Sequence, residues 1–177
     1  MYFLIILMAI LTLIIIFFQL TNEAKLRKIT YLNKFRHAQL YAVTFSEDNK
    51  KVVNDVFSLT RAENVLGRRD IVSNADIKVK TDDLTLSRNA AELIFYNDSF
   101  VLQRLKGQKR IWIKTDKNKV YLLCEPGCPL SENEAVGFDA ATYETVENGA
   151  FILHSGDLIL MGNTYFEYIE EGRDIYA

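Results

Sequence analysis

Apolar residues at the start of the chain form one long run, whereas those in the rest of the chain alternate with polar residues. The run extends from Tyr2 to Leu20 and is interrupted only by Thr12 and Gln19. A helix of this length is about 28 Å long, close to the roughly 30 Å of a bilayer's hydrocarbon core. The pattern therefore predicts one membrane-spanning helix over residues 1–21.

Basic residues follow the apolar run. Residues 21–36 carry five Lys or Arg and one acid, and no basic residue precedes Leu20. The positive-inside rule then places the following chain in the cytoplasm. A cleaved signal peptide is the alternative, but it needs a basic n-region, a shorter apolar core and a small-residue cleavage site, which this sequence lacks. Residues 22–37 fit an interfacial helix or a solvated linker equally well, since apolar residues recur there at helical spacing between the lysines and arginines.

From residue 38 onward, short stretches rich in Val, Ile, Tyr and Phe are separated by turn residues such as those at 96–99, 116–119 and 162–163. No stretch after residue 36 has a helical period. Many short strands at this spacing predict an all-β sandwich or barrel. The predicted strands lie at 41–45, 55–59, 63–67, 77–80, 90–95, 100–105, 110–115, 120–124, 150–154, 158–161 and 164–169.

Residues 129–143 break the strand pattern. They are acidic, poor in β-branched residues and rich in Ala, Glu and Gly. We expect a mobile surface loop there, with room for one helical turn. With its flanks, this segment forms an insertion around residues 116–146.

Charge and composition exclude several function classes. From residue 37 on, the chain carries 16 Lys or Arg and 22 Asp or Glu, a net charge of −6, which argues against a nucleic-acid partner. Cys124 and Cys128 are expected to be free thiols in the cytosol, and together with His154 they make a poor zinc site. The only other histidine is His37, and no phosphate-binding glycine loop occurs. We therefore expect no enzyme activity, no cofactor, no metal and no small-molecule substrate.

Four short motifs follow one another along the β-rich region, at 66–68, 74–77, 86–91 and 155–163. They read Leu-Gly-Arg, Asn-Ala-Asp-Ile, Leu-Ser-Arg-Asn-Ala-Ala and Ser-Gly-Asp-Leu-Ile-Leu-Met-Gly-Asn. Together they resemble the forkhead-associated domain, a β-sandwich of about eleven strands that binds phosphothreonine peptides at the loops of one end. The resemblance covers roughly residues 39–170 and implies such a sandwich over residues 38–171, followed by a tail at 172–177.

The resemblance assigns roles to residues of the predicted loops. A phosphate group carries a charge of about −1.5 to −2, so its binding site needs an arginine and short hydrogen-bond donors. By the resemblance, Arg68 grips the phosphate, Ser87 bonds it, and Arg88 adds positive charge. The alternative for the arginines is that they are solvated charges in turns, and for Ser87 that it closes a turn onto its own backbone.

Five further residues are predicted to shape the backbone rather than to bind. Gly67 would let the chain turn between its strand and the recognition loop. Gly156 and Asp157 are expected to form a tight turn in which the Asp side chain bonds nearby amides. The pair at 162–163 is expected to form a two-residue hairpin turn.

Two positions depart from the family pattern. Ala90 stands where the family has a histidine that braces the recognition loops. The family's asparagine, which holds the main chain of the peptide, is missing from the loop near Gln108. We expect Gln108 to substitute in part, while Lys109, with Lys106 and Arg110, keeps the site cationic.

The sequence thus predicts a membrane-tethered cytosolic binding module for a phosphothreonine-containing segment of a partner protein. By the resemblance, bacterial kinase signalling and cell-wall or division machinery are its settings. The alternative is a phosphate-independent scaffold that keeps the fold but has a decayed phosphate site.

Overall fold

The computed structural model describes residues 12, 16, 17, 19–21, 38–127, 130, 137–146 and 149–170. The chain divides into two compact units, residues 1–34 and 35–177, and each is described by itself. In the first unit the described residues are helical. Among the residues described, no helix has the length and apolar character needed to cross a membrane. The remainder of the predicted anchor, residues 22–37 and the tail at 172–177 lie outside the described residues.

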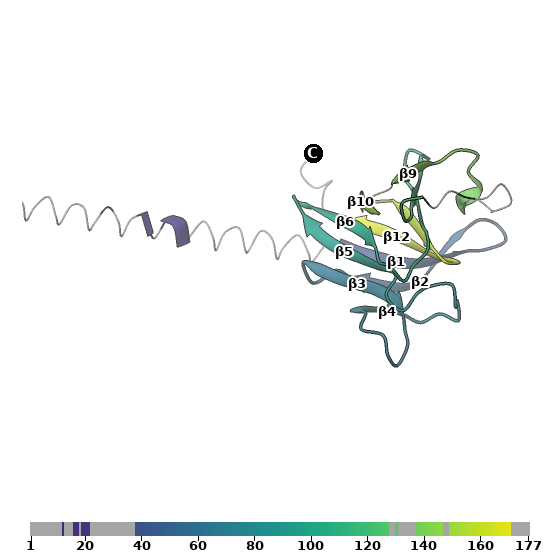
Figure 1. Cartoon of the computed structure of the whole chain (residues 1–177), viewed down its shortest axis with the longest axis horizontal. Helices are drawn as coiled ribbons and strands as arrows, with labels where there is room; N and C mark the ends of the chain where they lie inside the picture. The colour runs from purple at the N-terminus through teal and green to yellow at the C-terminus, as the bar shows by residue number, and fades with distance from the viewer. Residues whose placement is uncertain are drawn as a thin grey trace, which may run out of the picture. The chain divides into compact units, whose positions relative to one another are not determined.

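Within the described part of the second unit, twelve strands form two sheets. The seven-stranded sheet has the order β2-β1-β12-β11-β7-β8-β9, and the five-stranded sheet has the order β10-β6-β5-β3-β4. Figure 1 shows β3, β5 and β6 in one layer and β1 and β12 in the other. The prediction of an all-β sandwich is confirmed, with one strand more than expected. The strands are β1 Ala38–Phe45, β2 Lys51–Ser58, β3 Glu63–Arg68, β4 Ile77–Val79, β5 Ala91–Tyr96, β6 Ser99–Arg104, β7 Ile111–Lys114, β8 Val120–Leu123, β9 Glu144–Val146, β10 Ala150–Ile152, β11 Leu158–Met161 and β12 Thr164–Glu170.

Alternating side chains from both sheets build one core. In β5, Leu93 is completely buried, and Leu40 of β1 is buried in the same cluster from the opposite sheet. The rings of Phe100 in β6 and Tyr168 in β12 meet edge to face with centroids 6.2 Å apart. Such a contact adds about 0.5–1.5 kcal/mol beyond the burial of apolar area and ties the two layers together.

Two tight turns lie at the ends of β11. Met161 pairs with Thr164, so Gly162 and its successor form a two-residue hairpin turn, and Gly162 has φ +61°. Gly156 has φ +94°, a conformation that favours glycine. The fully buried Asp157 accepts a hydrogen bond from the main-chain N–H of His154 at 2.8 Å. Burial raises the pKa of Asp157, and this hydrogen bond opposes the rise.

The described part of the insertion packs against the outer face of the seven-stranded sheet. A 3₁₀ turn at Gly137–Asp139 lies against Trp112 of β7, where a side chain on Gly137 would collide with the indole ring. The rings of Trp112 and Tyr143 meet at 5.2 Å, and those of Phe138 and Tyr165 at 5.8 Å. The segment thus contains the one helical turn that the sequence allowed, and Phe138 and Tyr143 bury aromatic surface against the sheet. Its mobility stays a prediction.

Candidate functional site

The end of β3 lies beside the loop that joins β4 to β5. The main-chain N–H of Arg68 donates to the carbonyl of Ser87 at 2.9 Å, and the N–H of Ala90 donates to the carbonyl of Leu66 at 2.8 Å. Residues 66–68 and 87–90 therefore run side by side. The structure thus brings together the two residues that the sequence assigned to the phosphate.

Gly67 holds these two segments in close contact. It is buried inside β3, and a Cβ atom on it would overlap the carbonyl group of Arg88. Its φ is not positive, so the predicted role in a turn is wrong. Glycine is needed here because another backbone passes directly over its Cα.

Both hydrogen-bond donors of Ser87 are engaged within the protein. Its hydroxyl donates to the carbonyl of Gly107, and its main-chain N–H donates to Oε1 of Gln108 at 3.0 Å. Ser87 is half-buried rather than exposed. Donation from this hydroxyl to a phosphate therefore requires exchange of the bond to Gly107.

Gln108 is a brace between the β4–β5 loop and the β6–β7 loop. Only 4% of its surface is exposed, and its Nε2 donates to the carbonyl of Arg110 at 3.2 Å. Its amide therefore joins the main chain at Ser87 to the main chain at Arg110. The sequence expectation that Gln108 reaches the peptide does not fit this position. Gln108 instead braces the two loops through its side-chain amide. The side chain of Ala90 is buried and has no polar group that could form such hydrogen bonds.

The two arginines of the predicted site differ in how their charges are compensated. Nε of Arg88 donates to Oδ2 of Asp70 at 2.6 Å, and this hydrogen bond holds the pKa of Asp70 below its usual value. Arg68 is half-buried and has no acidic partner in the described ranges. Its Nη1 is shielded from solvent and lacks an acceptor there. The guanidinium of Arg68 therefore carries the less compensated charge.

Two hollows flank Ser87. The first, of about 440 Å³, is lined by Leu84, Lys109 and Trp112 together with Ser87 and Gln108, among others. The second, of about 570 Å³, is lined by Ser87, Arg88, Asn89, Leu105, Lys106 and Gly107. Each hollow thus has an exposed lysine at its rim.

The loop from β6 to β7 makes this region locally basic. Residues 104–110 contain four Lys or Arg and no acid, in a part of the chain that is acidic as a whole. Asn89 contributes an exposed amide to the second hollow, and sequence reasoning missed it. Its position directly after Arg88 is the signal that could have indicated it. The arrangement supplies cations and neutral donors around a concave surface.

Asp83 ties the β4–β5 loop to the hairpin of β11 and β12, and sequence reasoning missed it. Its Oδ2 accepts from the N–H of Asn163 at 2.7 Å and from the hydroxyl of Thr164 at 3.1 Å. Its Oδ1 accepts from the hydroxyl of Thr85 and from the N–H of Thr85, the latter at 2.9 Å. Burial alone would raise the pKa of Asp83, but these hydrogen bonds outweigh it and hold the pKa below its usual value. The partners lie 80 residues away in sequence, so no local pattern reveals the contact.

Two more side chains fix the main chain of the loops. The hydroxyl of Ser73 donates to the carbonyl of Arg88 at 2.9 Å. Nη1 of Arg104 donates to the carbonyl of Gln108 at 2.6 Å. Both the β4–β5 loop and the β6–β7 loop are therefore held in place by side chains other than the apolar Ala90.

A metal site finds no support in the described ranges, where no group of three or more His, Cys, Asp or Glu side chains is placed to hold an ion. Cys124 is buried and not in a disulfide, and Cys128 lies outside the described residues.

No protein-family model and no curated protein matches this sequence. Among solved structures, the FHA domain of CT664 from Chlamydia trachomatis is similar, with 17% identity and a TM-score of 0.45 over 76% of this chain and 98% of that one. The yeast splicing factor Pml1 is similar with 16% identity and a TM-score of 0.48 over 75% and 78%. The FhaA FHA domain in complex with the intracellular domain of Rv3910 follows with 14% identity and 0.43 over 74% and 98%. Function therefore has to be inferred from the residues of the site.

Proposed function

We propose that the β-sandwich binds a phosphothreonine-containing segment of a partner protein at the loops around Ser87. The observation that carries this proposal is Arg68, whose main chain bonds Ser87 and whose guanidinium has no acidic partner among the described residues. A guanidinium forms strong, paired hydrogen bonds with phosphate oxygens. Arg68 lines neither hollow itself, but its main chain bonds Ser87, which lines both, and each hollow has a lysine in its lining. A cluster of cations and donors of this kind favours an anion with several acceptor oxygens.

The contributions of the other residues follow from their partners. Lys106 and Lys109 are exposed at the rims of the two hollows and are placed to attract the charge of the phosphate. Asn89 offers an exposed amide to the peptide main chain, in place of the asparagine that is missing from the loop near Gln108. Arg88 is a secondary contact, because Asp70 already binds its Nε.

Two features of the site act in opposite directions on affinity. The braces at Gln108 and Asp83 hold the loops in place before the ligand arrives, which lowers the entropic cost of binding. The donors of Ser87, however, must be released from Gly107 and Gln108 before they can bind a ligand. We therefore expect a Kd of about 10⁻⁴ M, weak for a specific partner.

The setting we propose is the cytoplasmic face of a membrane, with residues 1–21 as the anchor. The apolar run and the basic residues that follow it support this topology. Kinase signalling and cell-wall or division machinery are the proposed contexts. A protease added to intact cells should leave the sandwich uncut and should reach it only after lysis, whereas digestion in intact cells contradicts the orientation.

A phosphate-independent scaffold is the second candidate function. The observation in its favour is that both donors of Ser87 are committed to the protein's own main chain and amide groups. In that case the partner binds another surface, and the loops around Ser87 have only a structural role.

The two functions separate in a peptide-binding experiment with the full-length protein in detergent. Degenerate peptide libraries centred on threonine, phosphothreonine and phosphoserine would be compared for retention by the wild type and by Arg68→Ala and Lys109→Ala. Arg61→Ala and Lys117→Ala are matched controls, since both residues are exposed, line neither hollow and, unlike Arg68, make no main-chain bond to Ser87. We expect retention of the phosphothreonine library by the wild type and both controls, and its loss with Arg68→Ala. Equal retention of all three libraries by every variant would favour the scaffold.

A further inference from the structure

Strand β2 forms one edge of the seven-stranded sheet and is exposed along nearly its whole length. Seven of its eight residues are exposed, including Val52 at 47%, Val53 at 44% and Val56 at 47%. No strand of the described residues pairs with its open side. An open edge presents unpaired main-chain groups to another chain, and proteins usually guard it with charged side chains or proline.

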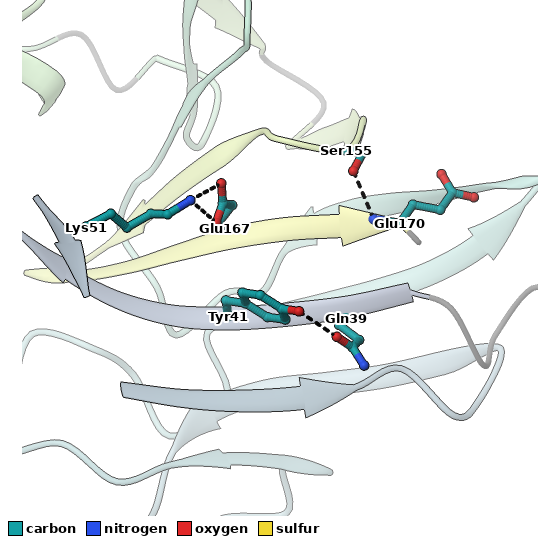
Figure 2. A network of polar contacts seen from close by, with 6 residues as sticks. All are labelled: Gln39, Tyr41, Lys51, Ser155, Glu167 and Glu170. Carbon is teal, nitrogen blue, oxygen red and sulfur yellow. Dashed lines mark hydrogen bonds and ion pairs between the residues drawn. The ribbon is translucent and has the colours of Figure 1, made fainter. Parts of the chain in front are cut away.

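The two charged residues of β2, Lys51 and Asp55, both have hydrogen-bond partners within the protein. Figure 2 shows Lys51 extending from β2 to Glu167 of β12, and its Nζ lies 2.6 Å from both carboxylate oxygens. Because β1 lies between these two strands, the lysine side chain reaches back over its own sheet. The carboxylate of Asp55 accepts the neighbouring N–H of Val56 at 3.0 Å. Lys51 is thus paired within its own sheet, and Asp55 is the other charged residue of the strand, beside Val56.

A β-bulge at the centre of β2 interrupts the alternation of its side chains between the two faces of the sheet. Val43 pairs with Val53, but the preceding residue Ala42 pairs with Asp55, so Asn54 has no partner in β1. Side chains of a regular strand alternate between the two faces of a sheet. The extra residue therefore reverses which faces the residues after it occupy.

As a result, the succession of inward-facing and outward-facing side chains along β2 is the same from either end of the strand. Val53 and Val56 lie on the outer face, because they pair with Val43 and Tyr41. Val52 and Phe57 lie on the inner face, opposite Thr44 and Leu40, and Phe57 packs against the core. An antiparallel copy of the same strand can then align with it, face for face.

We propose that β2 pairs antiparallel with β2 of a second copy of this chain, across a two-fold axis between Asn54 and Asp55. Val53 then lies opposite the partner's Val56, and this apolar pair occurs twice on the outer face. Val52 lies opposite the partner's Phe57 on the inner face. Asn54 lies opposite the partner's Asp55 and Lys51 opposite the partner's Ser58, so no two like charges are directly opposed, although the two Asp55 residues lie on either side of the axis, one residue apart along the strands. The two seven-stranded sheets become one continuous sheet, and the interface is isologous as in most homodimers.

Cysteine cross-linking tests the register in the full-length protein. Two differently tagged chains, one with Val53→Cys and one with Val56→Cys, both with Cys128→Ala, are co-expressed and mildly oxidised. Opposed residues of an antiparallel pair have Cα atoms about 4.5–5.5 Å apart, within the range for a disulfide. Two copies of position 53 would instead be offset by about 10 Å along the strands. We expect a disulfide between the two tags and none between two Val53→Cys chains, and cross-linking of every combination would overturn the register.

A charge placed at the edge tests the dimer itself. Val53→Lys is compared with Val72→Lys, a control at an exposed valine in the loop between β3 and β4, where the side chain is 63% exposed. Sedimentation equilibrium of the full-length protein in detergent should show a dimer that dissociates at least tenfold more readily with Val53→Lys and is unchanged with Val72→Lys. A monomeric wild type, or equal effects of the two variants, would overturn the proposal. This experiment measures dimerisation without any peptide, so its result does not depend on the proposed peptide binding.

Discussion

Replacing Gln108 by alanine should lower the free energy of unfolding by about 2 kcal/mol and weaken peptide binding. The variant leaves the N–H of Ser87 and the carbonyl of Arg110 without the partners that the amide supplies at 3.0 and 3.2 Å. Each buried polar group left unsatisfied costs about 1–3 kcal/mol. Because Ser87 is only half-buried, water can restore part of its bond, which places the total toward the lower end.

Thermal unfolding of the full-length protein in detergent measures this loss. Trp112 is the only tryptophan and is 7% exposed, so its fluorescence reports on the sheet next to this loop. For a domain near 150 residues, 1 kcal/mol shifts Tm by about 2–4 °C, so we expect a decrease of about 4–8 °C. Gln108→Glu keeps the acceptor for Ser87 and should fall between the wild type and Gln108→Ala. Gln103→Ala alters an exposed glutamine of β6 and should change stability by less than about 0.5 kcal/mol. If Gln108→Ala changes the free energy of unfolding as little as Gln103→Ala does, the Gln108 amide does not stabilise these loops.

Three other predictions follow from the packing and the polar contacts. Gly67→Ala should displace the Arg88 backbone, lower Tm and weaken phosphopeptide binding together, and unchanged values of both in melting and calorimetry would contradict the close approach. Asp83 stabilises the fold as a carboxylate with a pKa lowered from 3.8, so its contribution is present above about pH 4 and is lost as the pH falls below that value. In acid titrations followed by fluorescence, Asp83→Asn should therefore lose less stability between pH 5 and 3 than the wild type. Tyr143→Ala should remove the ring contact with Trp112 and cost about 2–4 kcal/mol, and a cost near zero would show that the insertion does not pack there.

Local patterns in the sequence were sufficient for most of the fold. The alternation of apolar and polar residues indicated nearly every strand from 38 onward, since it reflects one buried and one exposed face. The segment at 129–143 was the main exception. Its few aromatic residues, Phe138 and Tyr143, are spread over a stretch without a period, and their contact with Trp112 depends on tertiary packing.

The members of the site were easier to predict than their roles. Motif order placed Arg68 and Ser87 together, and the structure has them in main-chain contact. The brace at Gln108 and the tie at Asp83 join segments about 20 and 80 residues apart, so no sequence pattern could reveal them. Gly67 was expected in a turn because glycine is common there, whereas its actual reason is the backbone of Arg88 above its Cα.

Whether Arg68 binds phosphate is decided by the affinity of one peptide, with and without phosphate on its threonine, for the wild type and for Arg68→Ala. Calorimetric titration of the full-length protein gives the four binding free energies of this cycle. If Arg68 binds the phosphate, removal of either group should cost about 1.5–3 kcal/mol, and removal of the second should then cost little more. We expect this coupling for Arg68→Ala and none for Arg61→Ala. Equal affinity for both peptides in every variant would contradict phosphate recognition at this site.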